Sequence, residues 1–152
     1  MQTQRSTSRR ATRRLAGFTL EEVVISMGIA LGSILAVMSG YKVSMYRTEW
    51  SLNATAAQAL ATQRLEQTRV ARWEPNASSP VDELTAGNFP TVMRTLDVPV
   101  VGTNVPQAQL VTTITTVSSD PPMKWVQVDC VWSIGPRGPF TNTVTALRSA
   151  DL

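Results

Sequence analysis

Residues 17–41 read GFTLEEVVISMGIALGSILAVMSGY, and this stretch decides the fold expected for the chain. No charged residue occurs between Glu22 and Lys42, and most of the residues in this interval are aliphatic. A helix that crosses a bilayer needs about 20 predominantly apolar residues. Since the chain has no second run of this kind, we expect a single membrane-spanning helix over residues 18–41.

The segment before this helix is polar and basic. Residues 1–17 contain five arginines and no acidic residue. The whole chain has 14 basic and 11 acidic residues and a formal net charge of +3, so the chain beyond residue 17 has nine basic residues and a net charge of −2. We interpret residues 1–17 as a disordered leader. Because its arginines precede the apolar run, the positive-inside rule places the N-terminus in the cytoplasm and the C-terminal part outside.

The helical pattern continues beyond the apolar run. There is no proline or glycine between Lys42 and Pro75, and Pro75 is a stop signal. Apolar residues in this interval recur at spacings of three or four, which forms one stripe on a helix. The stripe consists of Val43, Tyr46, Trp50, Ala54, Ala57, Ala61 and Leu65. Polar residues such as Asn53 separate them. We expect one helix from about Phe18 to Trp73. The apolar stripe of its amphipathic part, residues 42–74, must pack against another part of the protein.

Residues 75–152 supply the expected cover. Residues 75–90 are rich in proline and polar residues and read as a loop, and the chain becomes β-like from Thr91. Three runs are typical of strands: 109–117, 124–134 and 140–147. Short connections between these runs favour antiparallel pairing. The predicted fold class is therefore α+β, with a long N-terminal helix and a small C-terminal antiparallel β-sheet packed on its second half.

The middle run alternates between two faces, as a strand does. One face carries Val126, Val128, Cys130, Trp132 and Ile134. Trp125 lies on the opposite face, because it is seven positions, an odd number, before Trp132. We expect Trp132 and Cys130 in the core, and Trp125 as a partly exposed packing residue.

The composition argues against catalysis and against a metal site. The chain has no histidine and one cysteine, which excludes a Ser-His-Asp set, an internal disulfide and a zinc site of the Cys/His type. Asp120 and Asp129 are two isolated acids, whereas calcium needs six or more oxygen ligands. We expect no catalytic residue, no metal and no cofactor.

The stretch that begins with Gly17, Phe18 and Thr19 resembles the class III signal of type IV prepilins and type II secretion pseudopilins. A basic leader ends in glycine, a phenylalanine opens an apolar helix, and Glu22 lies five residues beyond the glycine. The order of a short leader, one long helix and a small antiparallel sheet is similar to that family as well. The resemblance covers about the first 60 residues closely and the C-terminal half only by architecture.

The resemblance implies a processing step and a set of partners. A membrane prepilin peptidase cuts between Gly17 and Phe18 and N-methylates Phe18, so this chain is a substrate and not an enzyme. The mature chain then leaves the inner membrane and joins other pilin or pseudopilin subunits through an assembly platform. In the family, the glutamate at the position of Glu22 pairs with the N-terminal ammonium of an adjacent subunit.

Two features of the helix have alternative interpretations. Thr19 and Glu22 also fit a capping box, in which Glu22 has a local role at the start of the helix. Glu21 fits an ordinary acid of the first turn. Gly28 and Gly32 match the small-residue spacing that lets membrane helices approach closely, although membrane segments are rich in glycine in any case.

Two features favour a minor subunit of the filament. Many major pilins carry a C-terminal disulfide loop, which Cys130 alone cannot form. The last 29 residues, KWVQVDCVWSIGPRGPFTNTVTALRSADL, loosely resemble the last hairpin of minor pilins and I-type minor pseudopilins.

Other functions are possible on the same residues. Residues 1–40 could be a Sec signal or a permanent anchor of an exported protein, but Glu21 and Glu22 interrupt the basic-to-apolar transition that a Sec signal has. Nucleic-acid binding would depend on the arginines of the leader, which the proposed cleavage removes, so we expect no nucleic-acid partner.

Overall fold

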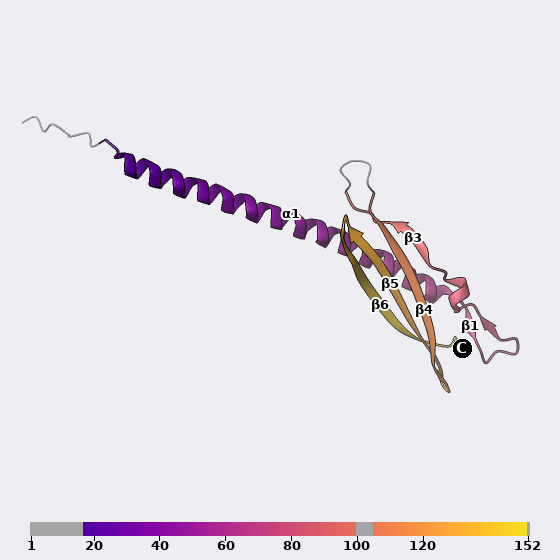
Figure 1. Ribbon diagram of the computed structural model, residues 1–152. Helices are drawn as coiled ribbons and strands as arrows, with labels where there is room; N and C mark the ends of the chain where they lie inside the picture. Colours follow the sequence, from indigo (N-terminus) through magenta and orange to yellow (C-terminus); the bar gives the residue numbers. More distant parts are fainter. Residues whose placement is uncertain (1–16, 100–104, 152) are drawn as a thin grey trace, which may run out of the picture. The chain divides into compact units, whose positions relative to one another are not determined.

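A computed structural model describes residues 17–99 and 105–151 of the chain. One α-helix, α1, extends over Leu20–Val70, and a four-stranded sheet follows (Figure 1). The chain divides into two compact units, with the boundary between Val43 and Ser44 inside α1. The first unit contains the apolar part of the helix. The second contains the rest of the helix and all of the strands.

The helix ends three residues earlier than the sequence predicted. α1 stops at Val70, and Trp73 belongs instead to a two-stranded sheet of β1 (Trp73–Glu74) and β2 (Val81–Asp82). The carboxylate of Glu83 accepts a hydrogen bond from the Arg72 backbone N–H at 3.0 Å, and the Glu83 N–H donates to the Arg72 carbonyl at 2.8 Å. These bonds replace helical ones, so the helix cannot continue through Arg72.

The segment predicted as a loop contains more structure than expected. Besides β2, it holds a short 3-10 helix, η1, over Ala86–Asn88. It also supplies two buried residues of the hydrophobic core, Leu84 and Phe89. The segment therefore contributes to the core and does not only connect the helix to the larger sheet.

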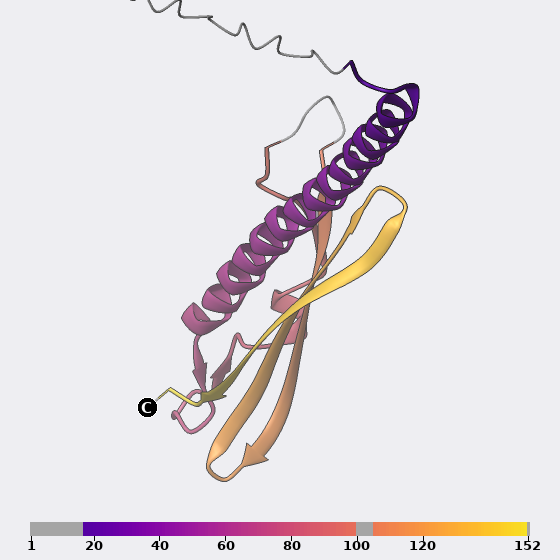
Figure 2. The same cartoon turned by 90° about the vertical axis from the view of Figure 1, so that its left-hand side faces the viewer.

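The predicted fold class, α+β with a small antiparallel sheet, is confirmed. The larger sheet has the order β3-β4-β5-β6, and all its neighbours are antiparallel. The strands are β3 (Val92–Thr95), β4 (Gln107–Ser119), β5 (Pro122–Ile134) and β6 (Arg137–Ser149). The last three contain the predicted runs and extend beyond them. Short turns join β4 to β5 and β5 to β6 (Figure 2).

The core of the second unit lies between the sheet and the second half of α1. The alternation predicted for β5 is confirmed, because Val126, Val128, Cys130 and Trp132 are all buried. They belong to one hydrophobic cluster with residues of the helix. The helical members are Ala57, Ala61 and Leu65.

The predicted apolar stripe on the helix is only partly correct. Val43 and Trp50 are exposed, whereas the polar residues Asn53 and Thr68 are buried. The Asn53 amide donates to the Glu49 carbonyl at 2.9 Å, and the Thr68 hydroxyl donates to the Leu65 carbonyl at 2.7 Å. Because a hydrogen bond to the helix backbone lowers the cost of burial, polar residues can occupy positions that a hydrophobicity pattern assigns to solvent.

Cys130 is fully buried, as predicted, and burial raises the pKa of its thiol to about 11. The thiol therefore stays protonated at neutral pH in the folded chain. We expect native protein at neutral pH to resist alkylation, and urea-unfolded protein to react readily. Because the folded pKa lies above the ordinary value near 9, the contribution of this thiol to stability declines as pH rises from about 9 to about 11. Rapid alkylation of folded protein would contradict this burial.

Lys124 is a buried cation that the sequence analysis did not single out. Its ammonium donates to both carboxylate oxygens of Asp82, at 2.6 and 2.7 Å, and to the Leu84 carbonyl at 2.8 Å. It also lies 4.8 Å from the centroid of the Trp73 ring. These contacts join β5 to the small β1–β2 sheet.

We expect the substitution Asp82→Ala to lower the free energy of unfolding by about 1–3 kcal/mol, because it leaves the Lys124 ammonium buried without its counter-charge. Half of the Asp82 side chain is exposed, which limits the loss. Urea unfolding of the detergent-solubilised chain measures the change. Glu66→Ala is the control, because it breaks an exposed pair with Arg69 and should change stability by less than about 0.5 kcal/mol. Equal effects of the two substitutions would contradict a special role for Lys124.

Candidate assembly site on the exposed helix

The proposed cleavage site lies immediately before α1. Gly17, Phe18 and Thr19 lie outside regular secondary structure and are exposed, and Phe18 is 87% exposed. A Cβ atom placed on Gly17 would meet no atom within 4 Å. The rest of the basic leader, residues 1–16, lies outside the described residues. A peptidase could therefore reach the bond between Gly17 and Phe18 without unfolding the helix.

Thr19 and Glu22 form a capping box. The Thr19 backbone N–H donates to Glu22 Oε2 at 2.9 Å, and the Thr19 hydroxyl donates to the same oxygen at 3.1 Å. The Glu22 N–H in turn donates to Thr19 Oγ1 at 3.3 Å. This arrangement satisfies backbone N–H groups that the first turn of a helix leaves without partners. The local interpretation of Glu22 that the sequence allowed is thus present in the structure.

The capping box does not use the whole carboxylate of Glu22. Both hydrogen bonds end on Oε2, and Oε1 accepts none from the part of the chain that the structure describes. A carboxylate has about four lone-pair sites, so Oε1 keeps the capacity to bind an ammonium group. Capping and pairing with a second chain are therefore compatible. Glu21, the adjacent first-turn acid, makes no hydrogen bond among the described side chains.

The helix beyond Glu22 presents apolar side chains on all sides. No residue between Val23 and Tyr41 is buried, and Val37 is 72% exposed. We call this the apolar helix surface. Its large side chains are Val23, Val24, Ile25, Met27, Ile29, Leu31, Ile34, Leu35, Val37, Met38 and Tyr41. Monomeric soluble proteins rarely expose an apolar surface of this extent, and surfaces of this kind mark sites of membrane or protein interaction.

By length and composition α1 can cross a membrane, and it lies near the N-terminus. Among polar groups in the apolar part, the Ser33 hydroxyl donates to the Ile29 carbonyl at 2.8 Å, which lowers the cost of placing this hydroxyl in lipid. Cβ atoms placed on Gly28 or Gly32 would meet no atom within 4 Å. These two glycines therefore leave a flat strip on the helix that another helix could approach.

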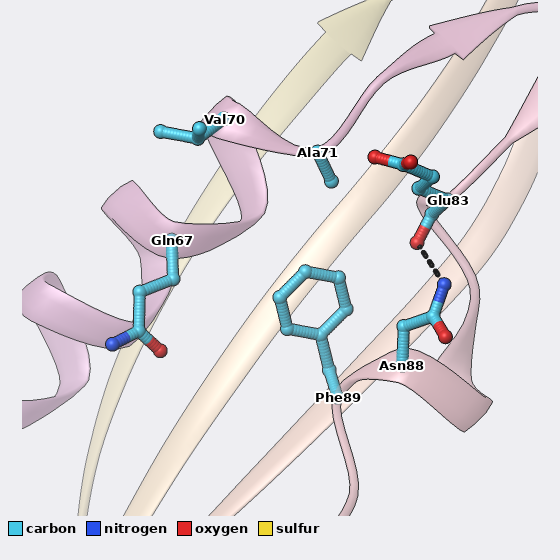
Figure 3. A pocket seen from close by; sticks show the side chains of 6 residues that line it. All are labelled: Gln67, Val70, Ala71, Glu83, Asn88 and Phe89. Carbon is cyan, nitrogen blue, oxygen red and sulfur yellow. Dashed lines mark hydrogen bonds between the residues drawn. The ribbon is translucent and has the colours of Figure 1, made fainter.

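The second unit has a shallow pocket beside the end of α1, with a volume of about 450 Å³ (Figure 3). It is lined by Gln67, Val70, Ala71, Glu83, Asn88 and Phe89. Two of its polar residues have local partners, because the Asn88 amide donates to the Glu83 carbonyl at 2.8 Å and the Glu83 carboxylate accepts the Arg72 N–H. The ring of Phe89 points between the helix and Glu83. These contacts join the end of α1 to residues 83–89, so we interpret the pocket as structural.

The acids considered for calcium lie in different settings. The Asp129 carboxylate accepts hydrogen bonds from the Gln127 amide at 2.9 Å and from the Thr143 hydroxyl at 2.6 Å. Asp120 lies in the turn before β5, where its N–H donates to Ser118 Oγ at 3.2 Å. Across residues 17–99 and 105–151, no three metal-binding side chains of His, Cys, Asp or Glu lie close enough to hold an ion together.

Comparisons with known protein families, with curated proteins and with solved structures found no match to this chain.

Proposed function

We propose that this protein is a structural subunit, a minor pilin or pseudopilin, of a type IV pilus or a type II secretion filament. The observation that carries the proposal is the sequence around Gly17, Phe18 and Glu22 at the start of an uncovered apolar helix. The rest of α1 and the strands form a separate α+β unit that begins at Ser44 and has its own hydrophobic core. A subunit of this kind binds its neighbours through the helix and exposes the α+β unit, here called the head.

Cleavage creates a cationic group that can pair with the carboxylate of Glu22. Cutting after Gly17 creates an ammonium on Phe18, whose reference pKa near 8 leaves it mostly charged at neutral pH. N-methylation of Phe18 keeps this charge. Glu22 Oε1, which the capping box leaves open, is the acceptor for the ammonium of an adjacent subunit. Since burying an ion pair costs desolvation, the pair fixes the register between subunits more than it adds affinity.

The apolar helix surface contacts lipid before assembly and other helices after it. Before assembly it lies in the inner membrane as a single span, with the leader in the cytoplasm and the head in the periplasm. A prepilin peptidase then processes the chain, and an inner-membrane assembly platform moves it into the filament. There the helices of other pilin or pseudopilin subunits replace the lipid, and the strip at Gly28 and Gly32 allows their close approach.

Fractionation of cells that produce the tagged protein tests the proposal. Filaments sheared from the cells, or secretion filaments purified from the envelope, should contain the tagged chain together with other subunits. Deleting the prepilin peptidase should keep the chain in the membrane fraction. A chain that stays in the membrane whether or not the peptidase is present would contradict the proposal.

We expect Gly17→Ala to slow processing, because a methyl group at the residue before the scissile bond hinders the close backbone approach that a peptidase needs. A pulse-chase experiment that resolves precursor from mature chain measures the rate. Gly28→Ala is the matched control, since it adds the same methyl group at a site with equal space and should be cut normally. Unchanged cleavage of Gly17→Ala would argue against this scissile bond.

A further inference from the structure

A second pocket in the head holds two arginines. It has a volume of about 340 Å³ and lies between the second half of α1 and the edge strand β3. Its lining residues are Leu60, Gln63, Arg64, Gln67, Val92, Arg94 and Leu110. Neither arginine lies within 4.0 Å of a carboxylate oxygen in the ranges that the structure describes. The pocket thus concentrates positive charge without an internal counter-ion.

Both walls of this pocket follow from regular structure. Gln63 and Arg64 both lie three or four residues from Leu60 and from Gln67, so the four residues share one face of α1. On the sheet, Val92 lies opposite Leu110 in the β3–β4 register. Arg94 is two residues beyond Val92 and therefore lies on the same face of β3. The two arginines therefore extend from the two walls of the pocket, Arg64 from the helix and Arg94 from the sheet.

The Arg64 guanidinium is fixed by neutral groups alone. Its Nε–H donates to Thr112 Oγ1 at 3.4 Å, Nη1 to Gln67 Oε1 at 3.1 Å and Nη2 to the Pro90 carbonyl at 3.0 Å. Its carbon atom Cζ lies 5.2 Å from the centroid of the Phe89 ring. Three of the five N–H groups of the guanidinium are used in this way, and two remain. Arg64 is therefore oriented in advance, with donors and charge still available.

Arg94 supplies a second charge beside Arg64. It is exposed and makes no side-chain hydrogen bond to any residue that the structure describes. Burial and the positive charge of Arg94 both lower the pKa of Arg64. Two like charges that face one pocket raise the free energy of the folded chain, and a bound anion would remove that cost.

We propose that this pocket binds a single oxyanion group, a carboxylate or a phosphate, between Arg64 and Arg94. The planar fork of a guanidinium matches two oxygens of either group. The pocket volume suits a small anion or the end of one acidic side chain. The anion comes either from solution or from a second copy of this chain. The proposal rests on the head alone and does not require the filament function.

Titration of the detergent-solubilised full chain with inorganic phosphate, and separately with acetate, tests the site. We expect the arginine Nε–H NMR signals of Arg64 and Arg94 to shift with a common dissociation constant. Arg94→Gln should weaken phosphate binding about tenfold, because it removes one charged donor set. This variant should keep the fold, since Arg94 has no partner to lose among the described residues. Arg69→Gln, on an exposed turn of the same helix, should bind like the wild type.

Arg64→Lys provides a second variant, because it keeps the charge and loses the fork. We expect weaker binding of phosphate by this variant as well, and circular dichroism verifies that it is folded. The site is overturned if phosphate and acetate leave both arginine signals unchanged, or if Arg94→Gln binds as well as the wild type. Binding that shifts many surface arginines and lysines equally would overturn it too.

Sedimentation velocity distinguishes the two sources of the anion. If the anion is a carboxylate of a second copy, phosphate dissociates oligomers of the wild type, and Arg94→Gln is smaller without phosphate. If the anion comes from solution, phosphate leaves the sedimentation coefficient unchanged while the NMR signals still shift. Both results support an oxyanion site at Arg64 and Arg94.

Discussion

Replacing Glu22 with alanine should leave membrane insertion and cleavage largely intact and remove most of the protein from filaments. The substitution deletes the acceptor of the Phe18 ammonium while the apolar helix surface and the head stay unchanged. The measurement is the fraction of mature chain in sheared or purified filaments, relative to the wild type. We expect a loss of at least tenfold, because removing the carboxylate leaves the Phe18 ammonium buried without its counter-charge, which costs about 3–5 kcal/mol.

The capping box makes two further variants necessary. Glu22→Ala removes both the cap and the charge, so it cannot separate the two roles alone. Glu22→Gln removes the charge, and glutamine can still complete a capping box. Thr19→Ala removes the capping hydroxyl and keeps the carboxylate, at a cost of about 0.5–2 kcal/mol in helix stability.

The two roles give opposite results for these variants. If the charge sets the register between subunits, Glu22→Gln fails to assemble and Thr19→Ala assembles. If Glu22 acts only as a cap, Glu22→Gln assembles normally and Thr19→Ala shows a defect. Normal assembly of both Glu22→Gln and Glu22→Ala would remove Glu22 from the account.

Replacing Trp132 with alanine should lower the free energy of unfolding by about 3–5 kcal/mol. Its side chain is 2% exposed, and its ring centroid lies 4.9 Å from that of Phe140 and 6.2 Å from that of Trp50. Its indole N–H also donates to Asn142 Oδ1 at 2.7 Å, and the Asn142 amide donates to Gln58 on the helix at 3.3 Å. The substitution therefore opens a cavity and breaks a connection between the sheet and α1.

Trp125→Ala is the matched control for this prediction. Trp125 lies on the same strand with its side chain 41% exposed on the other face, opposite Thr115 and Leu147. Cross-strand pairs of this kind contribute about 0.2–1 kcal/mol each, so the loss should stay below about 1.5 kcal/mol. Urea unfolding followed by circular dichroism measures both variants. Similar losses for the two tryptophans would contradict the assignment of the buried face.

Regular patterns explain why the sequence predicted the fold class. The uncharged run after Glu22 predicts a long helix. A run of so many apolar residues can lie in lipid as a helix, because a helix satisfies its backbone hydrogen bonds internally. Strict alternation from Val126 to Trp132 fixes a half-buried strand, and the structure buries those residues. The short turns on either side of β5 then leave antiparallel pairing as the simple solution.

The errors have a common physical cause, since they all depend on contacts between residues far apart in the chain. Asn53 looks solvated in the sequence and is buried, and Lys124 is buried because Asp82, 42 residues earlier, neutralises it. The strand at Trp73 forms because β2 pairs with it. The sequence did contain a signal for the burial of Lys124. It lies at the start of an alternating strand, on the side that carries Val126 and Val128, and its long side chain is mostly aliphatic.

The candidate sites also differ in how far the sequence predicts them. The capping box could be predicted from Thr19 and Glu22, because it depends on residues three apart in one chain. The arginine pocket could not, because Arg64 and Arg94 come together only when the helix packs beside β3. Two unpaired arginines 30 residues apart carry no signal until the fold is known.

The mass and N-terminal sequence of the chain, purified from the membrane and from filaments, show whether it is processed as a prepilin. We expect a chain that begins at Phe18 and carries one N-methyl group in both fractions. A working form that retains the arginine-rich leader would contradict this expectation. So would a chain that begins near Ser33, because Ala30-Leu31-Gly32 is the nearest match to a Sec cleavage site and such a chain would be a Sec-processed protein.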